Sequence, residues 1–212
     1  MAAADRLDLV VVRHGLTAWN RERRYQGHRD IPLALEAHEA LAILRDDLAR
    51  FDFGMAYCSD LTRCRQTLEF LLDEREEPVE PCFDARLREL DFGDYEGKCY
   101  EELKDLPAYR AWIDSRGEQA PPGGESAEAL RQRLEAWLGE LFAEARHEGH
   151  RQALVVTHGG VIRELRRRFE AIDFWEGSVG QGEGRCLTFL HRHGGWQCSS
   201  SSAVPMPASA RR

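Results

Sequence analysis

The sequence predicts an α/β fold, a three-layer αβα sandwich around a mostly parallel sheet with an antiparallel edge strand. Three short apolar runs lead to this prediction: DLVVV (8–12), GMAYCS (54–59) and ALVVT (153–157). Runs of this kind, bounded by polar residues or glycine, suit strands that are buried on both faces. Helical patterns lie between them, and such alternation is typical of a parallel sheet covered on both sides.

The helices follow from apolar residues that recur every three or four positions. This periodicity predicts helices over residues 35–50, 61–71 and 130–142. Ser126 is a suitable N-cap for the third helix, and Gly149 is a suitable end for it.

We expect a single domain over residues 1–198. Near its end, CLTFLHRHGGWQC (186–198) surrounds a Gly-Gly turn and predicts a hairpin at one edge of the sheet. Residues 94–125 are poorer in apolar pattern and are interpreted as an insertion, or lid, that contacts the substrate over the end of the sheet. The serine-rich segment 199–212 is interpreted as a flexible extension.

Charge and composition restrict the classes of partner. A formal net charge of −8 argues against nucleic acid or anionic lipid as a general partner. No run approaches the roughly 20 apolar residues that span a bilayer, and the N-terminus does not resemble a signal peptide. The six cysteines show no paired spacing and are interpreted as free thiols. We therefore expect a cytoplasmic protein that binds a small anion in a local cationic pocket.

Two of the expected strands end alike, in DLVVVRHG and ALVVTHGG. Each delivers a histidine followed by glycine where the strand stops, His14 in the first and His158 in the second. In open α/β sheets ligands bind beyond the carboxyl ends of the strands, and glycine there lets backbone amides approach an anion closely. One such histidine alone is commonly structural. The pair predicts a shared pocket with groups that titrate near neutrality.

A third segment, CSDLTRCRQT (58–67), runs from a strand directly into a helix. Ser59 or Asp60 can cap this helix, and Arg63 lies in its first turn. Because a helix N-terminus favours anions, an arginine beside it strengthens an oxyanion site. Arg65 is interpreted as a solvated surface charge, which is the commoner fate of arginine.

A fourth segment, RLRELDFGDYEG (86–97), supplies a candidate general acid. Glu89 lies close in sequence to Asp91, Asp94 and Glu96. Neighbouring carboxylates disfavour the ionised form of one another, so we expect Glu89 to hold a proton near neutral pH. Most acidic clusters are only solvated faces, and this interpretation depends on the other three segments.

Taken in order, RHGLTAWNRERRYQGHRDIPL, SDLTR, LRELDFGDYEG, PPGGES and VTHGG resemble the motifs of the histidine phosphatase superfamily. That superfamily includes cofactor-dependent phosphoglycerate mutases and many small phosphatases, and the resemblance covers most of residues 8–166. It implies that His14 is the nucleophile and Glu89 the proton donor. It assigns the phosphate clamp to Arg13, Arg63 and His158, and secondary phosphate contacts to Asn20, Gln26, Gly27 and the amide of Gly159.

The resemblance implies a reaction through a phosphohistidine. Fixed cations stabilise the charge that spreads over the phosphoryl oxygens in the transition state. The same charges lower the pKa of His14 and keep its ring neutral, while Glu89 protonates the leaving alcohol and then activates water. This chemistry requires no metal or other cofactor. The HRH segment (191–193) lacks a third ligand and is interpreted as the solvated face of a hairpin.

Within the superfamily, RELDFGDYEG is the phosphatase-like form, whereas mutases usually read like E-R-x-Y-G-x-L-x-G-L-N-K and carry a longer insertion. The sequence therefore predicts a phosphatase for small-molecule phosphate monoesters. A cofactor-dependent phosphoglycerate mutase and a non-catalytic phospho-ligand binder are the alternatives. The substrate stays open between sugar phosphate, phosphoglycerate-like and α-ribazole phosphate classes.

Aromatic residues, a helix start and the late hairpin lead to three further expectations. Tyr109, Trp112 and Trp175 can stack on a base or sugar, although aromatic residues in such positions are more often simply packed. Ala34 stands where the superfamily usually has a serine or threonine cap, so the helix that follows is less well capped, at a cost of about 1 kcal/mol. Homodimers are common in the superfamily, and the late hairpin offers an edge for one.

Overall fold

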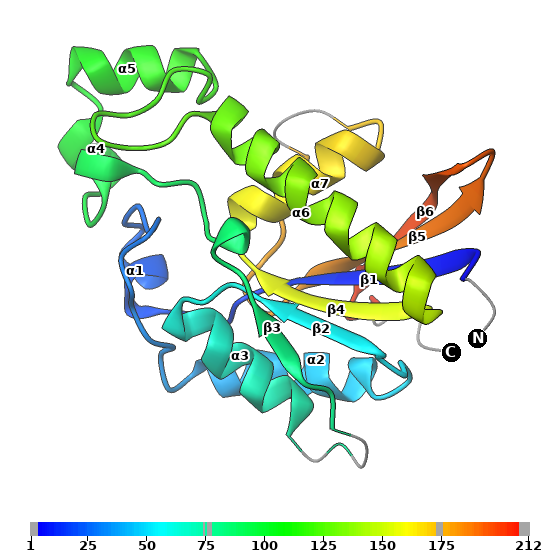
Figure 1. Cartoon of the computed structure of the whole chain (residues 1–212). Coiled ribbons are helices and arrows are strands. Elements are labelled where there is room, and N and C mark those ends of the chain that lie inside the picture. The colour runs from blue at the N-terminus through cyan, green and yellow to red at the C-terminus, as the bar shows by residue number, and fades with distance from the viewer. Residues whose placement is uncertain (1–3, 74, 76–77, 173–175, 208–212) are drawn as a thin grey trace.

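Six strands form one sheet in the order β3-β2-β4-β1-β5-β6 (Figure 1). The computed structural model describes residues 4–73, 75, 78–172 and 176–207. The strands are β1 (Arg6–Arg13), β2 (Met55–Cys58), β3 (Pro81–Phe83), β4 (Gln152–Thr157), β5 (Gly184–Arg192) and β6 (Gly195–Val204). The first four run parallel, and β5 and β6 are antiparallel to their neighbours. This topology confirms the predicted mostly parallel sheet with an antiparallel edge.

Strand β1 lies inside the sheet and is buried on both faces. Leu9 and Val11 belong to the apolar cluster on one face, and Val10 and Val12 belong to the cluster on the other. Side chains of a strand alternate between faces, so a continuous apolar run satisfies both layers. This is why DLVVV shows no polar alternation.

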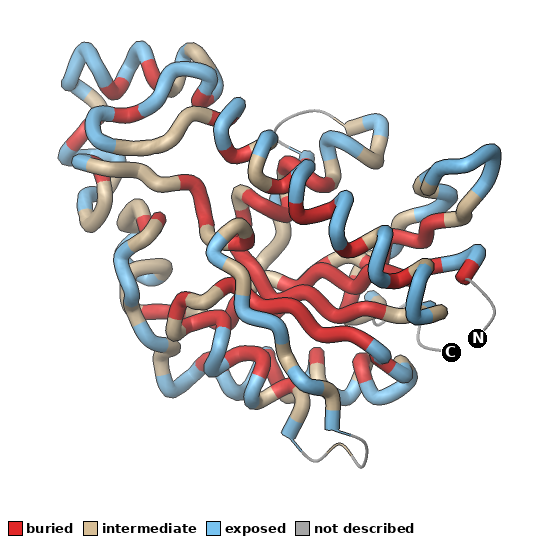
Figure 2. The backbone as a smooth tube through the Cα atoms, viewed as in Figure 1, coloured by how far each residue is buried: buried red, intermediate tan, exposed pale blue. Residues whose placement is uncertain are grey.

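Two pairs of helices cover the sheet and complete the predicted sandwich. In Figure 1, α2 (Ala37–Leu48) and α3 (Thr62–Leu72) lie below the sheet, and α6 (Ala127–Glu148) and α7 (Gly159–Phe169) lie above it. Figure 2 shows the buried residues concentrated in the sheet and on the inner sides of these helices. None of the helices in the described part of the chain is long and apolar enough to cross a membrane.

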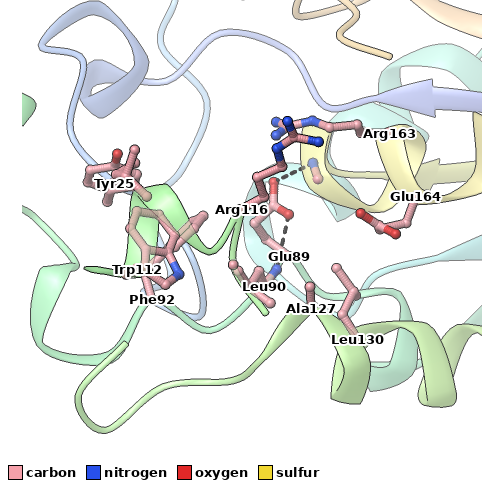
Figure 3. A pocket seen from close by; sticks show the side chains of 13 residues that line it. Tyr25, Glu89, Leu90, Phe92, Trp112, Arg116, Ala127, Leu130, Arg163 and Glu164 are labelled. Carbon is pink, nitrogen blue, oxygen red and sulfur yellow. Dashed lines mark hydrogen bonds between the residues drawn. The ribbon is translucent and has the colours of Figure 1, made fainter. Parts of the chain in front are cut away.

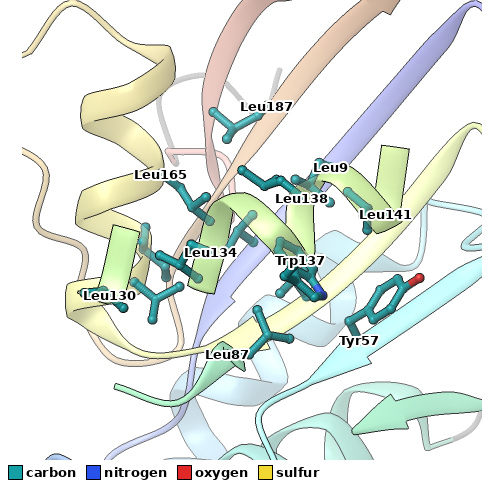
Figure 4. Packing of buried hydrophobic residues seen from close by; sticks show 14 of the residues in the cluster. Leu9, Tyr57, Leu87, Leu130, Leu134, Trp137, Leu138, Leu141, Leu165 and Leu187 are labelled. Carbon is teal, nitrogen blue, oxygen red and sulfur yellow. The ribbon is translucent and has the colours of Figure 1, made fainter. Parts of the chain in front are cut away.

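Helix α6 contributes the largest side chain of the upper core. Trp137 is buried and meets the ring of Tyr57 from β2 edge-on, with centroids 5.6 Å apart (Figure 4). The predicted ends of this helix are confirmed. The Ser126 hydroxyl accepts a hydrogen bond from the Ala129 amide, and Gly149 adopts a left-handed φ of 77°.

The starts of the two lower helices differ in how they are capped. Helix α2 has no side-chain cap, as the alanine at position 34 led us to expect. Neither Ser59 nor Asp60 caps α3, contrary to the sequence prediction. Instead Asp30, from a distant loop, accepts hydrogen bonds from the Thr62 amide (2.7 Å) and hydroxyl (2.6 Å).

The insertion predicted at 94–125 forms short helical pieces at one end of the sheet. They are η2 (Gly93–Tyr95), α4 (Tyr100–Leu103) and α5 (Pro107–Asp114), with α4 and α5 at the upper left of Figure 1. Three aromatic residues, Tyr95, Tyr109 and Trp112, attach this insertion to the upper core. It is therefore a packed part of the domain.

The prediction of a flexible extension from residue 199 is wrong for its first part. Strand β6 continues through Val204, which is buried, and pairs with β5 along its whole length. The physical reason is that β5 is 9 residues long and would otherwise present unpaired backbone groups. Residues 208–212 lie outside the described part of the chain.

We expect Gly139→Ala to stabilise the protein by about 0.5–1 kcal/mol, because glycine in a helix interior loses more conformational freedom on folding than alanine. Gly139 is exposed within α6, and an added Cβ would meet nothing within 4 Å. Urea unfolding measures the change. Gly124→Ala is the opposite control, since its Cβ would lie 2.4 Å from the Asp91 carbonyl oxygen. A lower urea midpoint for Gly139→Ala would contradict the expectation.

Candidate active site

The register of β1 and β4 brings the two predicted histidines together. Arg13 pairs with Thr157 at the carboxyl ends of these strands, so His14 and His158 leave the sheet side by side. Their ring centroids are 5.2 Å apart with the planes at 63°, and both rings are buried. The shared pocket inferred from two similar strand ends is therefore present in the fold.

The surroundings of His14 fix which of its nitrogens can react. Nδ1 lies 2.7 Å from the carbonyl oxygen of Gly15. A carbonyl oxygen only accepts hydrogen bonds, so Nδ1 carries the proton and Nε2 holds the lone pair. Burial, followed by the positive charges of Arg63 and Arg13, holds the pKa of His14 well below its ordinary value. The ring is thus neutral at neutral pH, with its lone pair on Nε2.

Arg63 and His158 contact each other behind His14. Nε of Arg63 donates to Nδ1 of His158 at 3.3 Å, and Nε2 of His158 donates to the Ser59 hydroxyl at 2.9 Å. Burial and the charge of Arg63 keep the pKa of His158 well below its ordinary value. Ser59, expected as a helix cap, instead orients this imidazole.

The Arg63 guanidinium is fully buried and held by backbone carbonyl groups. Its terminal nitrogens donate to the carbonyl oxygens of Gly27 at 2.7 Å and Arg29 at 2.8 Å. Gly27 therefore enters the site through its carbonyl group. A Cβ at Gly27 would lie 2.6 Å from the Leu90 carbonyl oxygen and 2.9 Å from the Phe92 amide nitrogen, so only glycine fits there.

A cavity of about 180 Å³ opens in front of His14, and we call it the phosphate cavity. It is lined by Arg13, His14, Asn20, Arg24, Tyr25, Gln26, Glu89, Phe92, Gly159, Gly160, Arg163, Ser178 and Val179. Of the nine site residues predicted from the sequence, six line it. The other three are Arg63, His158 and Gly27, which lie behind this surface.

Two buried donors of the phosphate cavity lack a partner within the described part of the chain. They are Nε of Arg13 and the amide nitrogen of Gln26. The other ends of these side chains are fixed, because Arg13 donates to the Val179 carbonyl oxygen at 2.8 Å and Gln26 accepts from the Thr17 hydroxyl at 2.7 Å. A buried donor without a partner is costly, because it loses its hydrogen bonds to water and gains none within the protein.

Asn20 and Gly159 complete the wall of the phosphate cavity. Asn20 lies in the short helix α1 (Ala18–Arg21), where its side-chain oxygen accepts from the Thr17 amide at 3.1 Å. Gly159 is the first residue of α7, and a Cβ there would lie 3.1 Å from Cζ of Arg13. The glycine therefore lets the Arg13 guanidinium pass directly over the start of a helix, where amides favour anions.

The Glu89 carboxylate is held by two backbone amides. It accepts from Gly160 at 2.9 Å and from Leu90 at 3.0 Å, as the dashed lines in Figure 3 show. A Cβ at Gly160 would lie 2.2 Å from Oε1 of Glu89. The second glycine of the THGG segment therefore allows the carboxylate to reach the α7 N-terminus.

The acidic neighbours of Glu89 in the sequence turn away from it. Asp91 accepts from the Gly93 amide at 2.8 Å, and Glu96 accepts from the amides of His28 (2.6 Å) and Arg29 (2.8 Å). These carboxylates hold the loops of the site in place. The crowding of carboxylates inferred from the sequence is therefore not the environment of Glu89.

Arg163 is a site residue that the sequence analysis missed. It lies in α7 one turn after Gly159 and lines the phosphate cavity, and its charge lowers the pKa of Arg13. The available signal was helical spacing, because residues four apart share a helix face. The strand-end motif THGG does not itself include Arg163, because this residue follows one helical turn later in α7.

Arg163 also lines a second cavity, of about 290 Å³, which we call the apolar cavity. Of the aromatic residues expected to stack on a substrate, Trp112 lines this cavity. Tyr109 does not, since it is fully buried and bonded through its hydroxyl to that of Tyr25 at 2.7 Å. Trp175 lies outside the described residues.

Two other segments lie apart from these cavities. Arg65 is exposed, as expected, and its guanidinium lies over the Phe83 ring at 4.2 Å. His191 of the HRH segment packs edge-on against Trp196, with ring centroids 5.3 Å apart. Across the described residues, no three histidine, cysteine or acidic side chains are arranged to hold a metal ion.

Known proteins with similar sequences include a phosphoglycerate mutase-like protein and a phosphatase. The chain is 36% identical over 168 residues to phosphoglycerate mutase-like protein 4 of Arabidopsis thaliana, covering 77% of this chain and 71% of that protein. It is 32% identical over 179 residues to the adenosylcobalamin/alpha-ribazole phosphatase of Escherichia coli K12, covering 82% of this chain and 86% of the relative.

Solved structures agree with the observed topology. A putative alpha-ribazole-5'-P phosphatase from Escherichia coli K-12 superposes with a TM-score of 0.78 at 27% identity, over 91% of this chain and 94% of that one. A phosphoglycerate mutase from Bacillus anthracis gives 0.77 at 25% identity, over 93% of each chain. Residues 9–202 match the family model described as histidine phosphatase superfamily (branch 1). The chain belongs to the histidine phosphatase superfamily (branch 1).

Proposed function

We propose that this protein is a phosphatase that hydrolyses small-molecule phosphate monoesters through a phosphohistidine on His14. One observation supports this most strongly. The neutral His14 ring lines a cavity that it shares with the Arg13 guanidinium and the Glu89 carboxyl group. A nucleophile, a phosphate-binding cation and a proton donor thus meet around a space of about 180 Å³.

In the first step Nε2 of His14 attacks phosphorus, and the bond from phosphorus to the ester oxygen breaks. Glu89 transfers a proton to that oxygen, so that the product leaves as a neutral alcohol. The phosphoryl group carries its negative charge past Arg13 and Arg163 on the cavity wall. Fixed guanidinium groups stabilise that charge without solvent reorganisation.

In the second step the Glu89 carboxylate takes a proton from water while the water oxygen attacks phosphorus. The bond from phosphorus to Nε2 breaks, inorganic phosphate leaves, and His14 returns to its neutral form. The proton that Glu89 donated in the first step is thereby restored. All the charges that these steps require come from side chains of this protein.

Arg63 and His158 act from behind the nucleophile in this proposal. The Arg63 charge lowers the pKa of His14 and adds positive potential at the phosphoryl position. His158 meets His14 edge-on and is itself held by Arg63 and Ser59. It thus orients the nucleophile, and Arg63 supplies the charge.

Phosphoglycerate mutase activity is the second candidate, because relatives bear both kinds of name. The chemistry differs only in the acceptor of the phosphoryl group, which is water in a phosphatase and a second phosphorylated acid in a mutase. A mutase needs cations to bind the second anionic group of its substrate. Arg116 and Arg163 are the cations that line the cavity beside the phosphate cavity, and the rest of its lining is mostly apolar, which favours the phosphatase.

A panel of metabolite phosphates scored by kcat/KM tests the proposal. We expect release of inorganic phosphate, an acid-labile phosphoenzyme trapped during turnover, and a rate loss of at least about 10⁴-fold in His14→Ala. A chelator should leave the rates unchanged. Interconversion of phosphoglycerate isomers without phosphate release would identify a mutase instead. No turnover by a folded sample would leave only binding.

The protonation of His14 and His158 gives a second test. Their folded-state pKa values lie below the unfolded value of about 6.5, so between these values the unfolded chain binds more protons. We expect both rings to stay neutral by NMR at pH 6, and the free energy of unfolding to fall as the pH drops below about 6.5. Substituting His14→Gln should weaken that slope. Titration of the His14 ring at or above pH 6.5 would refute the argument.

The role of Glu89 is tested by varying the leaving group. Glu89→Gln keeps the shape of the side chain but has no proton to donate. We expect kcat/KM to fall by about 10²–10⁴-fold for alkyl phosphates and far less for nitrophenyl phosphate, whose leaving group needs no proton. Asp91→Asn, a carboxylate two residues away, is the matched control. Equal losses with both leaving groups would show that Glu89 is not the proton donor.

A further inference from the structure

The apolar cavity adjoins the phosphate cavity at the proton donor. Glu89, Gly160 and Arg163 line both spaces, together with Tyr25 and Phe92. In the proposed reaction Glu89 protonates the ester oxygen, so this oxygen lies next to the carboxyl group. The organic part of the leaving alcohol, which is bonded to that oxygen, therefore extends toward the apolar cavity. The chemistry of this second cavity should set the leaving group that the protein accepts.

One wall of the apolar cavity is aromatic. Tyr25, Phe92 and Trp112 form a mutually contacting group, with ring centroids 5.0, 5.5 and 5.9 Å apart. The Tyr25 hydroxyl is already bonded to that of Tyr109, so Tyr25 contributes mainly its ring. Figure 3 shows the three aromatic side chains together on one side of Glu89 and Leu90.

Aliphatic side chains complete the lining. Leu90 is two residues before Phe92 in the sequence, and Ile113 directly follows Trp112. Ala127 and Leu130 come from the first turn of α6. In Figure 3 these last two lie on the other side of Glu89 and Leu90 from the aromatic group. A space bounded in this way offers dispersion contacts and excludes water, and it offers few partners for hydroxyl groups.

The charged residues of the apolar cavity are few. Figure 3 shows the Arg163 and Arg116 side chains converging beside the Glu89 carboxylate, at the end nearest the reaction. The fourth charged residue, Glu164, accepts from Arg167 at 3.0 Å and lies 3.8 Å from Arg131. The remainder of the cavity would leave buried hydroxyl groups of a small sugar or acid unpaired, at a cost in binding free energy.

We propose that the apolar cavity is the leaving-group subsite, and that it selects phosphate esters of ring-bearing, largely apolar alcohols over those of small hydroxylated ones. The inference rests on the proposed function, because it takes Glu89 as the proton donor. The size agrees, since 290 Å³ is about twice the roughly 150 Å³ of an apolar cavity that holds benzene. A fused two-ring group therefore fits.

A matched pair of substrates tests this selection. Naphthylmethyl phosphate and glycerol phosphate are both alkyl phosphates whose alcohols need a proton to leave, and they differ in the apolar surface of the leaving group. We expect kcat/KM to favour naphthylmethyl phosphate by at least about 50-fold, since a single methylene in an apolar pocket is worth roughly 10- to 200-fold. Inhibition by phosphonates, which are not hydrolysed, measures binding without turnover. Naphthylmethylphosphonate should bind at least tenfold more tightly than methylphosphonate.

Substitutions in the lining of the apolar cavity test whether this cavity causes the substrate preference. Ile113→Ala and Trp112→Leu remove lining groups and should each reduce the substrate preference by about tenfold. Leu103→Ala is the control, because Leu103 is buried in the same insertion and lines neither cavity. If the control changes the preference as much as Ile113→Ala, the subsite assignment is wrong. Should a variant fail to fold, the phosphonate comparison on the unmodified protein decides.

The outcomes separate this inference from the proposed function. Hydrolysis of both substrates with similar kcat/KM, or a preference for glycerol phosphate, would overturn the subsite and leave the phosphatase intact. No hydrolysis of either substrate and no labelling of His14 would overturn both. A preference for naphthylmethyl phosphate that is lost in Ile113→Ala and kept in Leu103→Ala would support the subsite.

Discussion

The parallel pairing of β1 with β4 is the constraint on which the site depends. Because Arg13 lies opposite Thr157, the residues that follow in each strand emerge at one point of the sheet edge. A shift of one residue in this register would turn every side chain of a strand to the opposite face. The apolar runs prevent such a shift, since Val11 belongs to the core cluster above the sheet and Val12 to the one below. Core packing thus sets the positions of His14 and His158.

Buried positive charge is the second determinant of the site. Burial lowers the pKa of both Arg13 and Arg63, and each donates hydrogen bonds to backbone carbonyl oxygens. A carbonyl dipole satisfies a guanidinium geometrically without cancelling its charge. The surplus positive potential then acts on the imidazoles, which stay neutral, and on any phosphate that enters. In the proposed reaction, the same arrangement would activate the nucleophile and attract the substrate.

Glu89 is held by residues of α7 and α6, which lie far from it in the chain. The Glu89 carboxylate accepts a hydrogen bond from the Gly160 amide of α7. The backbone carbonyl oxygen of Glu89 accepts one from Arg133 of α6 at 2.9 Å. Arg133 in turn pairs with Glu125 at 2.8 Å, which belongs to the PPGGES segment. None of residues 121–126 lines either cavity. The function of this segment in the structure is to fix the loop that carries Glu89.

The sequence by itself determined the fold class, the two histidines and the arginine of the SDLTR segment. These follow from local pattern, because a doubly buried strand and the glycine behind it are written in consecutive residues. Only the tertiary structure decided which groups surround each of them. The partners of Ser59 and Glu89 come from segments far away in the chain, and their contacts depend on strand register and on the angle at which α7 leaves the sheet. Likewise, β6 reaches Val204 because β5 needs a hydrogen-bonding neighbour, a requirement that the serine-rich composition of that segment does not reveal.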